Sequence, residues 1–437
     1  MRQMKDSGIL YAKEIPYSWE VQKTNDICSI ITDYVASGSF ASLAENVKYL
    51  DEPDYAMLIR TTDISGKGHS SKPVYIDKHA YEFLSNSNLN GGEIVLPNIG
   101  ASVGDAYIVP QLYERMTLAP NSIMLRTKYC DKYYYYYFLC DAGRLSVIDI
   151  SNSTAQPKFN KTAFRQIRVP VPPLPEQQAI SSYLDRQCAH IDNIIEKTKA
   201  SIEEYKKLRQ AVITQAVTKG VRGDRPMKDS GIEWIGEIPQ EWKVTRIKNI
   251  FTLRDERNSL PLEEVNLISL YTDKGVVQHC DLEKTTGNKA SNADGYKLVY
   301  ENDIVVNIIL CWMGAIGRSA YNGVTSPAYD IYVPSDKIEC EYYHHYFRTS
   351  GFSGDCFKRG RGIMLMRWRT YSDQFRDIRV PYPPITEQRE ILAYLNKKCT
   401  EIDSLITKKE TFLTELEAYK KSMIYEYVTG KKEVPQS

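Results

Sequence analysis

Two loops in this 437-residue chain combine side chains that are well suited to contacting nucleic acids. Amide and guanidinium groups read base edges through paired hydrogen bonds, while hydroxyl and ammonium groups hold phosphates. The alternative interpretation of any single residue in these loops is that it belongs to a polar connector leading into the next helix. The candidate contacts are Asn152, Ser153, Thr154, Gln156, Lys158 and Asn160 in SNSTAQPKFN (151–160), and Lys358, Arg359, Arg361, Arg367 and Arg369 in KRGRGIMLMRWR (358–369).

Weaker candidates of the same kind lie in three other predicted loops. The turn SGSF contributes hydroxyl groups, the loop SGKGHSSK at 65–72 contributes cations and hydroxyl groups, and the segment after residue 253 contributes guanidinium groups. Solvated loops commonly carry such residues, so their spacing alone does not assign them a role. These candidates are Ser37, Ser39, Lys67, His69, Ser71, Lys72, Arg254 and Arg257.

No constellation of catalytic residues is convincing. The 65–72 loop lacks the GxxxxGK[ST] spacing of a phosphate loop, and no [DN]PP[FY] tetrad typical of adenine methylation is present. DLEK at 281–284 could suggest a nuclease metal site, but such clusters are common on solvated loops. His344 and His345 have no further His or Cys at ligand spacing, which favours a structural pair. We therefore predict a non-catalytic chain without a metal site.

The elements that would position these loops are repeated. Residues 167–220 and 378–430 align without a gap at an offset of 211. In each copy prolines hold the chain extended, a glutamate follows in the first helical turn, and apolar residues recur at heptad-like spacing over roughly 42 residues, or about 60 Å. A single apolar stripe on so long a helix needs a partner, and the other copy is the obvious one. The predicted stripe comprises Leu184, Cys188, Ile191, Ile195 and Ile202, answered by Leu395, Cys399, Ile402, Ile406 and Leu413.

A second repeat divides the chain into two half-chains. MKDSGILYAKEIPYSWEV at 4–21 returns as MKDSGIEWIGEIPQEWKV at 227–244, so each half has an opening tag, a body and a long helix. Trp19 and Trp242 suggest tags pinned by a buried indole. Each body alternates short strands with turns, among them YAMLIRTTDI and NLISLYTDKGVV, which we expect to be strands. The run DKYYYYYFL predicts a helix whose tyrosines pack in the core more plausibly than they stack on bases.

Composition limits the possible classes of protein. Lysine and arginine total 56 against 55 acidic residues, so any DNA-binding surface must be a local patch or be completed by a partner. No apolar run is long enough to span a membrane and the segment MRQMKDSGIL lacks the apolar core of a signal peptide, so we expect a soluble cytoplasmic protein. Nine cysteines without CxxC spacing predict reduced core residues.

The doubled order of these motifs resembles the specificity subunit of a type I restriction-modification enzyme. The resemblance covers essentially the whole chain and rests on PPLPEQ at 172–177, PPITEQ at 383–388 and the tag GIEWIGEIPQEW at 231–242. The first tag departs from the pattern, reading ILYAKEIP. The residues that match the family's helix-entry motif, and that we expect to serve helix entry and partner binding, are Pro173, Glu176, Gln177, Pro384, Glu387 and Gln388.

The resemblance implies an α/β (α+β) chain with two similar target recognition domains, separated by two long helices that form an antiparallel coiled coil with pseudo-twofold symmetry. The predicted boundaries are 1–166 and 227–377 for the recognition domains and 167–226 and 378–437 for the helices. Each domain would read one half of a bipartite, asymmetric site in double-stranded DNA.

The resemblance also implies partners. Two methylation subunits would bind S-adenosylmethionine and methylate adenine, and motor-nuclease subunits would join for cleavage, so this chain itself would need no cofactor. The rival interpretations are a stand-alone nuclease or methyltransferase, and a two-domain protein-binding scaffold without DNA sequence preference.

Overall fold

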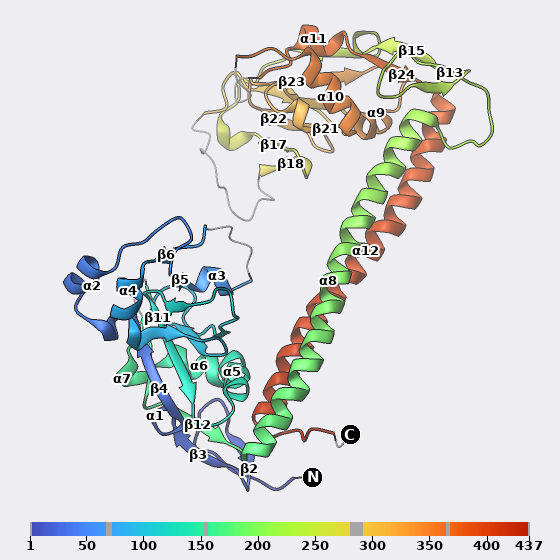
Figure 1. Ribbon diagram of the computed structural model, residues 1–437. Coiled ribbons are helices and arrows are strands. Elements are labelled where there is room, and N and C mark those ends of the chain that lie inside the picture. The colour runs from blue at the N-terminus through green and yellow to red at the C-terminus, as the bar shows by residue number, and fades with distance from the viewer. Residues whose placement is uncertain (1, 67–71, 153–155, 280–291, 364–367, 436–437) are drawn as a thin grey trace. The chain divides into compact units, whose positions relative to one another are not determined.

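The computed structural model describes residues 2–66, 72–152, 156–279, 292–363 and 368–435, and it divides into two compact units (Figure 1). The first unit comprises Met1–Thr198 and Thr411–Ser437, and the second comprises Lys199–Glu410. Each unit thus contains one body together with part of each long helix.

The two long helices are α8 (Leu174–Lys219, 46 residues) and α12 (Ile385–Val428, 44 residues). In the first unit, the Tyr183 and Tyr427 rings lie 4.6 Å apart, and Lys420 pairs with Asp192 at 2.6 Å. In the second unit, Arg209 pairs with Asp403 at 2.9 Å, and Arg222 pairs with Glu390 at 2.7 Å. Residue numbers rise along α8 as they fall along α12, so in each unit the helices pair in opposite directions, as predicted (Figure 1).

The predicted apolar stripe is largely withdrawn from solvent. Leu184 and Leu395 are fully buried, and each belongs to the main hydrophobic core of its unit. The body and its helices therefore share one core, which fixes the helix entry relative to the body of the same unit. Buried stripe residues are Leu184, Cys188, Ile191, Ile202, Leu395, Cys399 and Ile402, and half-buried ones are Ile195, Ile406 and Leu413.

Each body is built on a four-stranded antiparallel sheet of the same plan. In the first unit the strand order is β4-β11-β8-β9, and in the second it is β16-β23-β20-β21. Their bounds are β4 Cys28–Asp33, β8 Ile94–Pro97, β9 Tyr107–Ile108, β11 Ser122–Thr127, β16 Phe251–Arg254, β20 Ile304–Asn307, β21 Ile316–Arg318 and β23 Tyr329–Pro334.

Smaller paired elements also recur in both units. The tags form hairpins, and the strand that precedes each long helix pairs with the strand that begins at the end of each tag. They are β1 Met4–Asp6 with β2 Glu14–Pro16, β3 Glu20–Lys23 with β12 Arg168–Val171, β13 Met227–Asp229 with β14 Glu237–Pro239, and β15 Lys243–Arg246 with β24 Arg379–Tyr382.

The helices of the bodies recur in a matching order. The tyrosine run forms a helix whose Tyr133, Tyr134 and Tyr137 are fully buried, as predicted for core packing. Equivalent helices are α5 Asp131–Leu139 and α9 Cys340–Phe347, α6 Asp141–Asp149 and α10 Ser350–Arg359, and α7 Lys161–Phe164 and α11 Ser372–Arg376.

The remaining elements differ between the bodies. The first has a second four-stranded sheet in the order β6-β5-β10-β7, and the second has two-stranded sheets β17-β18 and β19-β22. Bounds in the first are β5 Ala56–Ile59, β6 Tyr75–Ile76, β7 Asn88–Leu89, β10 Met116–Leu118, α1 Thr24–Ile27, η1 Tyr34–Ser37, α2 Phe40–Asn46, α3 Thr61–Ile64, α4 Lys78–Phe83 and η2 Ser85–Ser87. Bounds in the second are β17 Ile268–Tyr271, β18 Gly275–Gln278, β19 Lys297–Val299, β22 Gly323–Thr325, η3 Ile247–Asn249, η4 Leu262–Glu264 and η6 Cys311–Met313.

Two predicted strands end sooner than expected. YAMLIRTTDI leaves β5 at Ile59 and forms the short helix α3, because Asp63 accepts a hydrogen bond from the Arg60 backbone N–H at 2.8 Å and caps the turn. NLISLYTDKGVV is a hairpin rather than one strand, and Gly275, at φ +73°, lies where β18 begins.

Each long helix ends at a glycine in the left-handed region, Gly220 at φ +76° and Gly430 at φ +71°. A Cβ at Gly430 would lie 2.4 Å from Pro16 and 2.9 Å from Trp19, so the tag closes directly over this exit. The predicted buried indoles are confirmed, because both Trp19 and Trp242 are fully buried. Among the described residues, no helix has the length and hydropathy needed to cross a membrane.

Candidate nucleic-acid interface

The entry of α8 is organised around Glu176 in its first turn. Trp19 Nε1 donates a hydrogen bond to Glu176 Oε2 at 2.9 Å, and the Arg2 guanidinium contacts both carboxylate oxygens, at 2.5 and 2.9 Å. A carboxylate here also complements the positive end of the helix. The tag, the N-terminal segment and the long helix are thus held together by one charged group.

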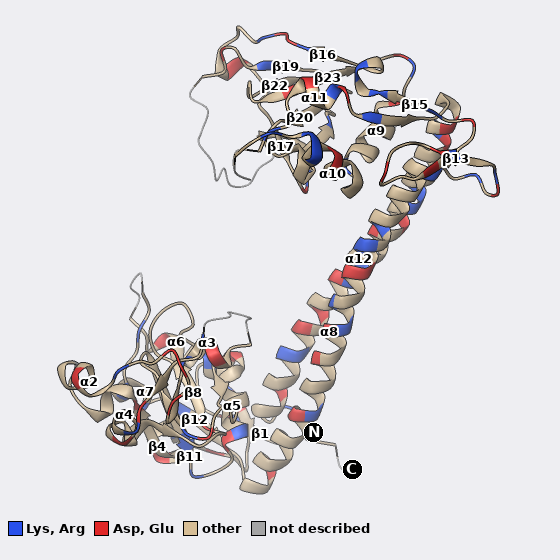
Figure 2. Cartoon of the chain, turned by 45° about the horizontal axis from the view of Figure 1, so that its top comes forward, with Lys and Arg blue, Asp and Glu red and all other residues tan. Residues whose placement is uncertain are grey.

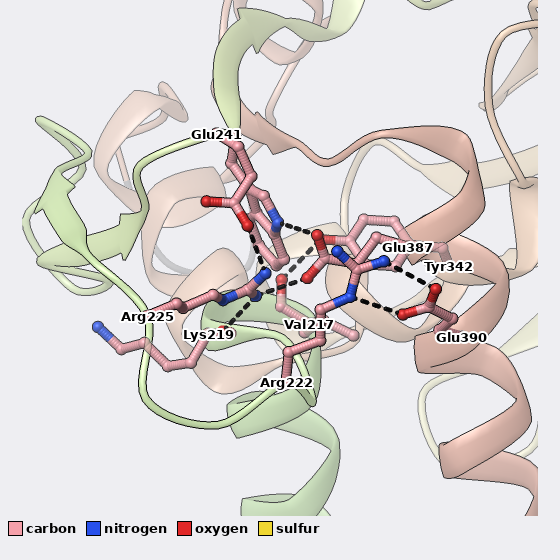
Figure 3. A network of polar contacts seen from close by, with 9 residues as sticks. Val217, Lys219, Arg222, Arg225, Glu241, Tyr342, Glu387 and Glu390 are labelled. Carbon is pink, nitrogen blue, oxygen red and sulfur yellow. Dashed lines mark hydrogen bonds and ion pairs between the residues drawn. The ribbon is translucent and has the colours of Figure 1, made fainter.

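The entry of α12 repeats this arrangement with greater burial (Figure 3). Trp242 Nε1 donates to Glu387 Oε2 at 2.9 Å, and Arg225 forms an ion pair with Glu387 Oε1 at 2.5 Å. Arg225 also pairs with Glu241 at 2.8 Å and donates to the carbonyl of Lys219, in the last turn of α8, at 3.0 Å. The side chain of Glu387 is fully buried, whereas that of Glu176 is 26% exposed.

The neighbouring glutamines are also turned inward. Gln177 accepts from the Cys130 backbone N–H at 3.2 Å and donates to the Pro172 carbonyl at 2.8 Å. Gln388 accepts from the Glu339 backbone N–H at 2.9 Å and donates to the Pro383 carbonyl at 2.9 Å. The carbonyls of Pro173 and Pro384 accept the first backbone hydrogen bonds of the two helices. These side chains fix where each body meets its helix, and their contact with a partner stays a prediction.

In the first body, the 151–160 loop lies against the connection between β8 and β9. Asn152 pairs with Lys158 through the backbone, and Lys158 pairs with Ile99 in the same way. The side chain of Asn160 caps α7 by accepting from the Ala163 N–H at 2.8 Å. Asn152, Gln156, Lys158 and Asn160 are exposed, and Ser153 and Thr154 lie outside the described residues.

The weaker candidates of the first body are not drawn into one cluster. Ser39 caps α2 by accepting from the Ser42 N–H at 3.3 Å, whereas the Ser37 hydroxyl is buried without a hydrogen-bond partner among the described residues. Lys72 is exposed, and its carbonyl accepts from Arg60 at 2.7 Å. Lys67, His69 and Ser71 lie outside the described residues, as does the DLEK segment at 281–284.

In the second body, Lys358 and Arg359 belong to the last turn of α10 rather than to the predicted loop, and the loop that follows them is held at its base. Arg361 and Arg369 exchange backbone hydrogen bonds of 2.8 and 2.9 Å, and Thr370 N donates to the Ile308 carbonyl at 2.9 Å, in the connection between β20 and β21. Trp368 stacks on Phe357 with ring centroids 5.0 Å apart. Arg367 lies outside the described residues.

Several basic candidates already have acidic partners. Lys358 pairs with Glu233 at 2.6 Å, Arg257 with Asp255 at 2.7 Å, and Arg359 lies 3.9 Å from Asp377. Arg254 is 14% exposed and contacts both carboxylate oxygens of Asp303 at 3.1 Å. Burial raises the pKa of Asp303, and the hydrogen bond from Arg254 opposes that rise. Arg254 is therefore a largely buried residue that pairs with Asp303, whereas its position in the sequence suggested an exposed cation.

The two strongest candidate loops occupy the same place in the repeated sheet. Each packs against the connection between its equivalent strands, 98–106 after β8 and 308–315 after β20. Sequence reasoning missed these connections, although exposed apolar residues mark the second one. Met313 is 53% exposed, and Ile363, in the neighbouring loop, is 96% exposed. Apolar groups of this kind can contact the methyl group of thymine.

The charge pattern is mixed throughout. Figure 2 shows lysine and arginine interspersed with acidic residues along α8 and α12 and on both bodies. This agrees with a formal net charge of +1. Binding to a polyanion would therefore depend on local groups.

Comparison with known families decides the classification. The family model for the type I restriction modification DNA specificity domain matches residues 16–204 and 239–417. The chain belongs to this family. Its two specificity domains are arranged in tandem, and each match covers one body together with most of the long helix that follows it.

Individual relatives agree with this assignment. The chain is 24% identical over 438 residues to the assigned specificity subunit of type I restriction enzyme MjaX from Methanocaldococcus jannaschii, covering 96% of this chain and 94% of that protein. It is 26% identical over 307 residues to the EcoBI specificity subunit of Escherichia coli, covering 63% of this chain and 61% of that protein.

Solved structures share the fold of the specificity domains. One is a chain from a structure concerning complex assembly and conformational transition of the type I R-M system, with a TM-score of 0.68 at 11% identity, covering 96% of this chain and 99% of that chain. Another is the HsdS subunit from Thermoanaerobacter tengcongensis, with a TM-score of 0.54 at 13% identity, covering 96% and 98%. The predicted fold class is thereby confirmed, and the domain boundaries stay a prediction.

Proposed function

We propose that this chain is the non-catalytic DNA-reading subunit of a type I restriction-modification complex. Each specificity domain reads one half of a bipartite, asymmetric site in double-stranded DNA. The observation that carries the proposal is the placement of two unlike polar loops at the same position of the repeated sheet, 151–160 beside 98–106 and 358–369 beside 308–315. Equivalent positions with different side chains suit two different half-sites.

Catalysis would belong to the partners. Two methylation subunits would bind S-adenosylmethionine and methylate adenine, and motor-nuclease subunits would cleave DNA in the full complex. The near-neutral chain fits this division, because affinity for DNA scales with the number of phosphates neutralised and a partner can supply part of that charge. A protein-binding scaffold without DNA sequence preference is the alternative.

A selection from random duplexes tests the proposal. The full chain is incubated with its methylation subunit, and bound duplexes are sequenced. We expect two short specified segments separated by an unspecified gap of fixed length. A pool that stays random under these conditions would favour the scaffold.

The paired long helices are proposed to set the gap between the half-sites. Removing one heptad from each, residues 197–203 and 408–414, preserves the apolar stripe and shortens each helix by about 10 Å. At about 3.4 Å per base pair, the gap should shrink by about three base pairs while both half-sites persist. Mapping methylated adenines in the reconstituted complex measures the gap, and an unchanged gap would refute this role.

A further inference from the structure

The second specificity domain contains an open pocket at a place where the first domain has larger side chains. The pocket has a volume of about 680 Å³ and lies between α8, α9, α10 and the turn that joins β17 to β18. Its walls include Arg209, Lys274, Trp312, His344, His345 and Ser353. Small-molecule sites commonly have volumes of about 300–1,000 Å³, so this one is large enough for a phosphate together with its attached sugar.

The first domain has larger residues at two of the equivalent positions. The hydroxyls of Tyr133 and Tyr342 donate to the carbonyls of Val428 and Val217 in the last turns of the long helices, which aligns the two tyrosine-rich helices. In this alignment, Tyr135 and Tyr136 of the first domain correspond to His344 and His345 of the second. Tyr136 donates to Asp185 on α8 at 2.8 Å. The histidine rings of the second domain are smaller than these tyrosines and line its pocket.

A pair of equivalent glycines confirms the difference in packing. A Cβ built at Gly104 would lie 3.0 Å from Ile148 and 3.2 Å from Arg144. A Cβ built at Gly314, which lines the pocket, would meet only Ser353, at 4.0 Å. The first domain is therefore closely packed at this position, and the second is not.

The pocket carries an excess of positive charge. Arg209, Lys274 and Arg348 line it, against the carboxylate of Asp273. Arg209 also pairs with Asp403 outside the lining. Arg348 donates to the backbone carbonyls of Gly314, Ile316, Thr272 and Asp273, and these neutral acceptors leave its charge unneutralised. Such an environment attracts an anion.

Hydrogen-bond donors accompany the charge. His344 Nδ1 accepts from the Arg318 backbone N–H at 3.0 Å, so the ring proton resides on Nε2. Burial is the main cause that lowers the pKa of His344 to about 3 and that of His345 to about 4, so both rings are neutral at pH 7. Trp312 Nε1 is buried and has no hydrogen-bond partner in the described part of the chain. A buried donor of this kind is costly unless a ligand satisfies it.

From this geometry we propose that the pocket binds a sugar phosphate, with Arg209 and Lys274 providing the charge for the phosphate. Two sources present this group, the backbone of bound DNA and a free nucleotide. The DNA source rests on the proposed function, whereas the free nucleotide does not.

The test uses the full chain and two probes. Ribose 5-phosphate is titrated calorimetrically with ribose as the uncharged control, and a duplex from the selection is bound over a range of salt concentrations. The variants are Arg209→Gln, Lys274→Gln and His345→Tyr, the last of which fills the pocket without removing a cation. Lys420→Gln is the matched control, because Lys420 and Asp192 form the equivalent interhelix pair of the first unit at 2.6 Å.

If either source is correct, the three pocket variants weaken sugar-phosphate or duplex binding at least tenfold, and Lys420→Gln does not. For DNA, the slope of log K against log salt also falls by about 0.9 in Lys274→Gln, the contribution of one phosphate. For a free nucleotide, ribose 5-phosphate binding is lost while the slope is unchanged. Equal binding of both probes by wild type and all pocket variants overturns the inference. Absence of any sequence preference in the wild-type chain instead counts against the proposed function, and ribose 5-phosphate still tests the pocket.

Discussion

The two helix entries use the same three groups, whereas the two bodies share a central sheet and three helices but differ in the sheets beside it. Trp19 and Trp242 each donate to a first-turn glutamate at 2.9 Å, and an arginine outside the repeated tags completes each network. The sheets beside the central one differ, four strands in the first body and two pairs in the second. The shared contacts suit a common framework, and the different sheets suit the two different half-sites proposed for this chain.

The entries differ in burial, and that difference should govern their stability. Glu387 is fully buried with Arg225 10% exposed, whereas Glu176 and Arg2 are 26% and 20% exposed. Removing one member of a buried pair leaves an uncompensated charge and costs about 3–5 kcal/mol. Glu387→Ala should reach this range, and Glu176→Ala should cost less, roughly 1–3 kcal/mol, because water reaches its partner. Denaturant unfolding of both variants measures the difference, and equal losses would show that burial does not distinguish the entries.

Lowering the pH should destabilise the second unit before the first. The pKa of His344 is lowered to about 3 and that of His345 to about 4, chiefly by burial, with nearby Arg318, Arg348 and, for His345, Arg209 acting in the same direction. Both residues take up protons more readily when unfolded. Their contribution is complete above an unfolded pKa of about 6.5 and is lost as pH falls toward 4, about 1 kcal/mol for each histidine at pH 5.5.

Hydrogen exchange at pH 7 and pH 5.5 measures this effect separately in each unit, after correction for the intrinsic pH dependence of exchange. His345→Tyr, which introduces the residue type of the first unit, should remove about half of the acid sensitivity of the second. Identical sensitivity in this variant and in wild type would assign the effect to other groups.

The tyrosines that cap the helix exits should matter equally in the two units. Tyr133 donates to the Val428 carbonyl at 2.8 Å, and Tyr342 donates to the Val217 carbonyl at 2.7 Å, both fully buried. Tyr133→Phe and Tyr342→Phe should each cost about 1 kcal/mol, because each leaves one buried carbonyl without that donor. Thermal unfolding of the two variants side by side checks this. A loss of stability in only one of them would show that the two helix ends are not equivalent.

The repeated sequence predicted the framework well because its signals are local or periodic. Heptad-like spacing identified both long helices and their buried Leu184 and Leu395, and the proline-rich entries located their starts within a few residues. The pairing followed because each helix has one apolar stripe and its copy is the matching partner, and the resemblance to the family implied the antiparallel direction.

The candidate interface was less predictable because partners distant in the sequence decide it. Arg254 looked like an available cation, but folding places it against Asp303, 49 residues away. Arg2 and Arg225 gave no local signal of their roles, since their glutamates lie 174 and 162 residues further along the chain. Likewise, only the packed structure shows that the histidines at the positions equivalent to Tyr135 and Tyr136 line a pocket.

Exchange of one body tests the central claim most directly. Residues 245–377 are replaced by the corresponding body of another specificity subunit, leaving the tags, both long helices and the first body intact. In a duplex selection with the methylation subunit present, we predict that one half-site changes while the other half-site and the gap persist. A change in both half-sites, or in neither, would contradict the assignment of one half-site to each specificity domain.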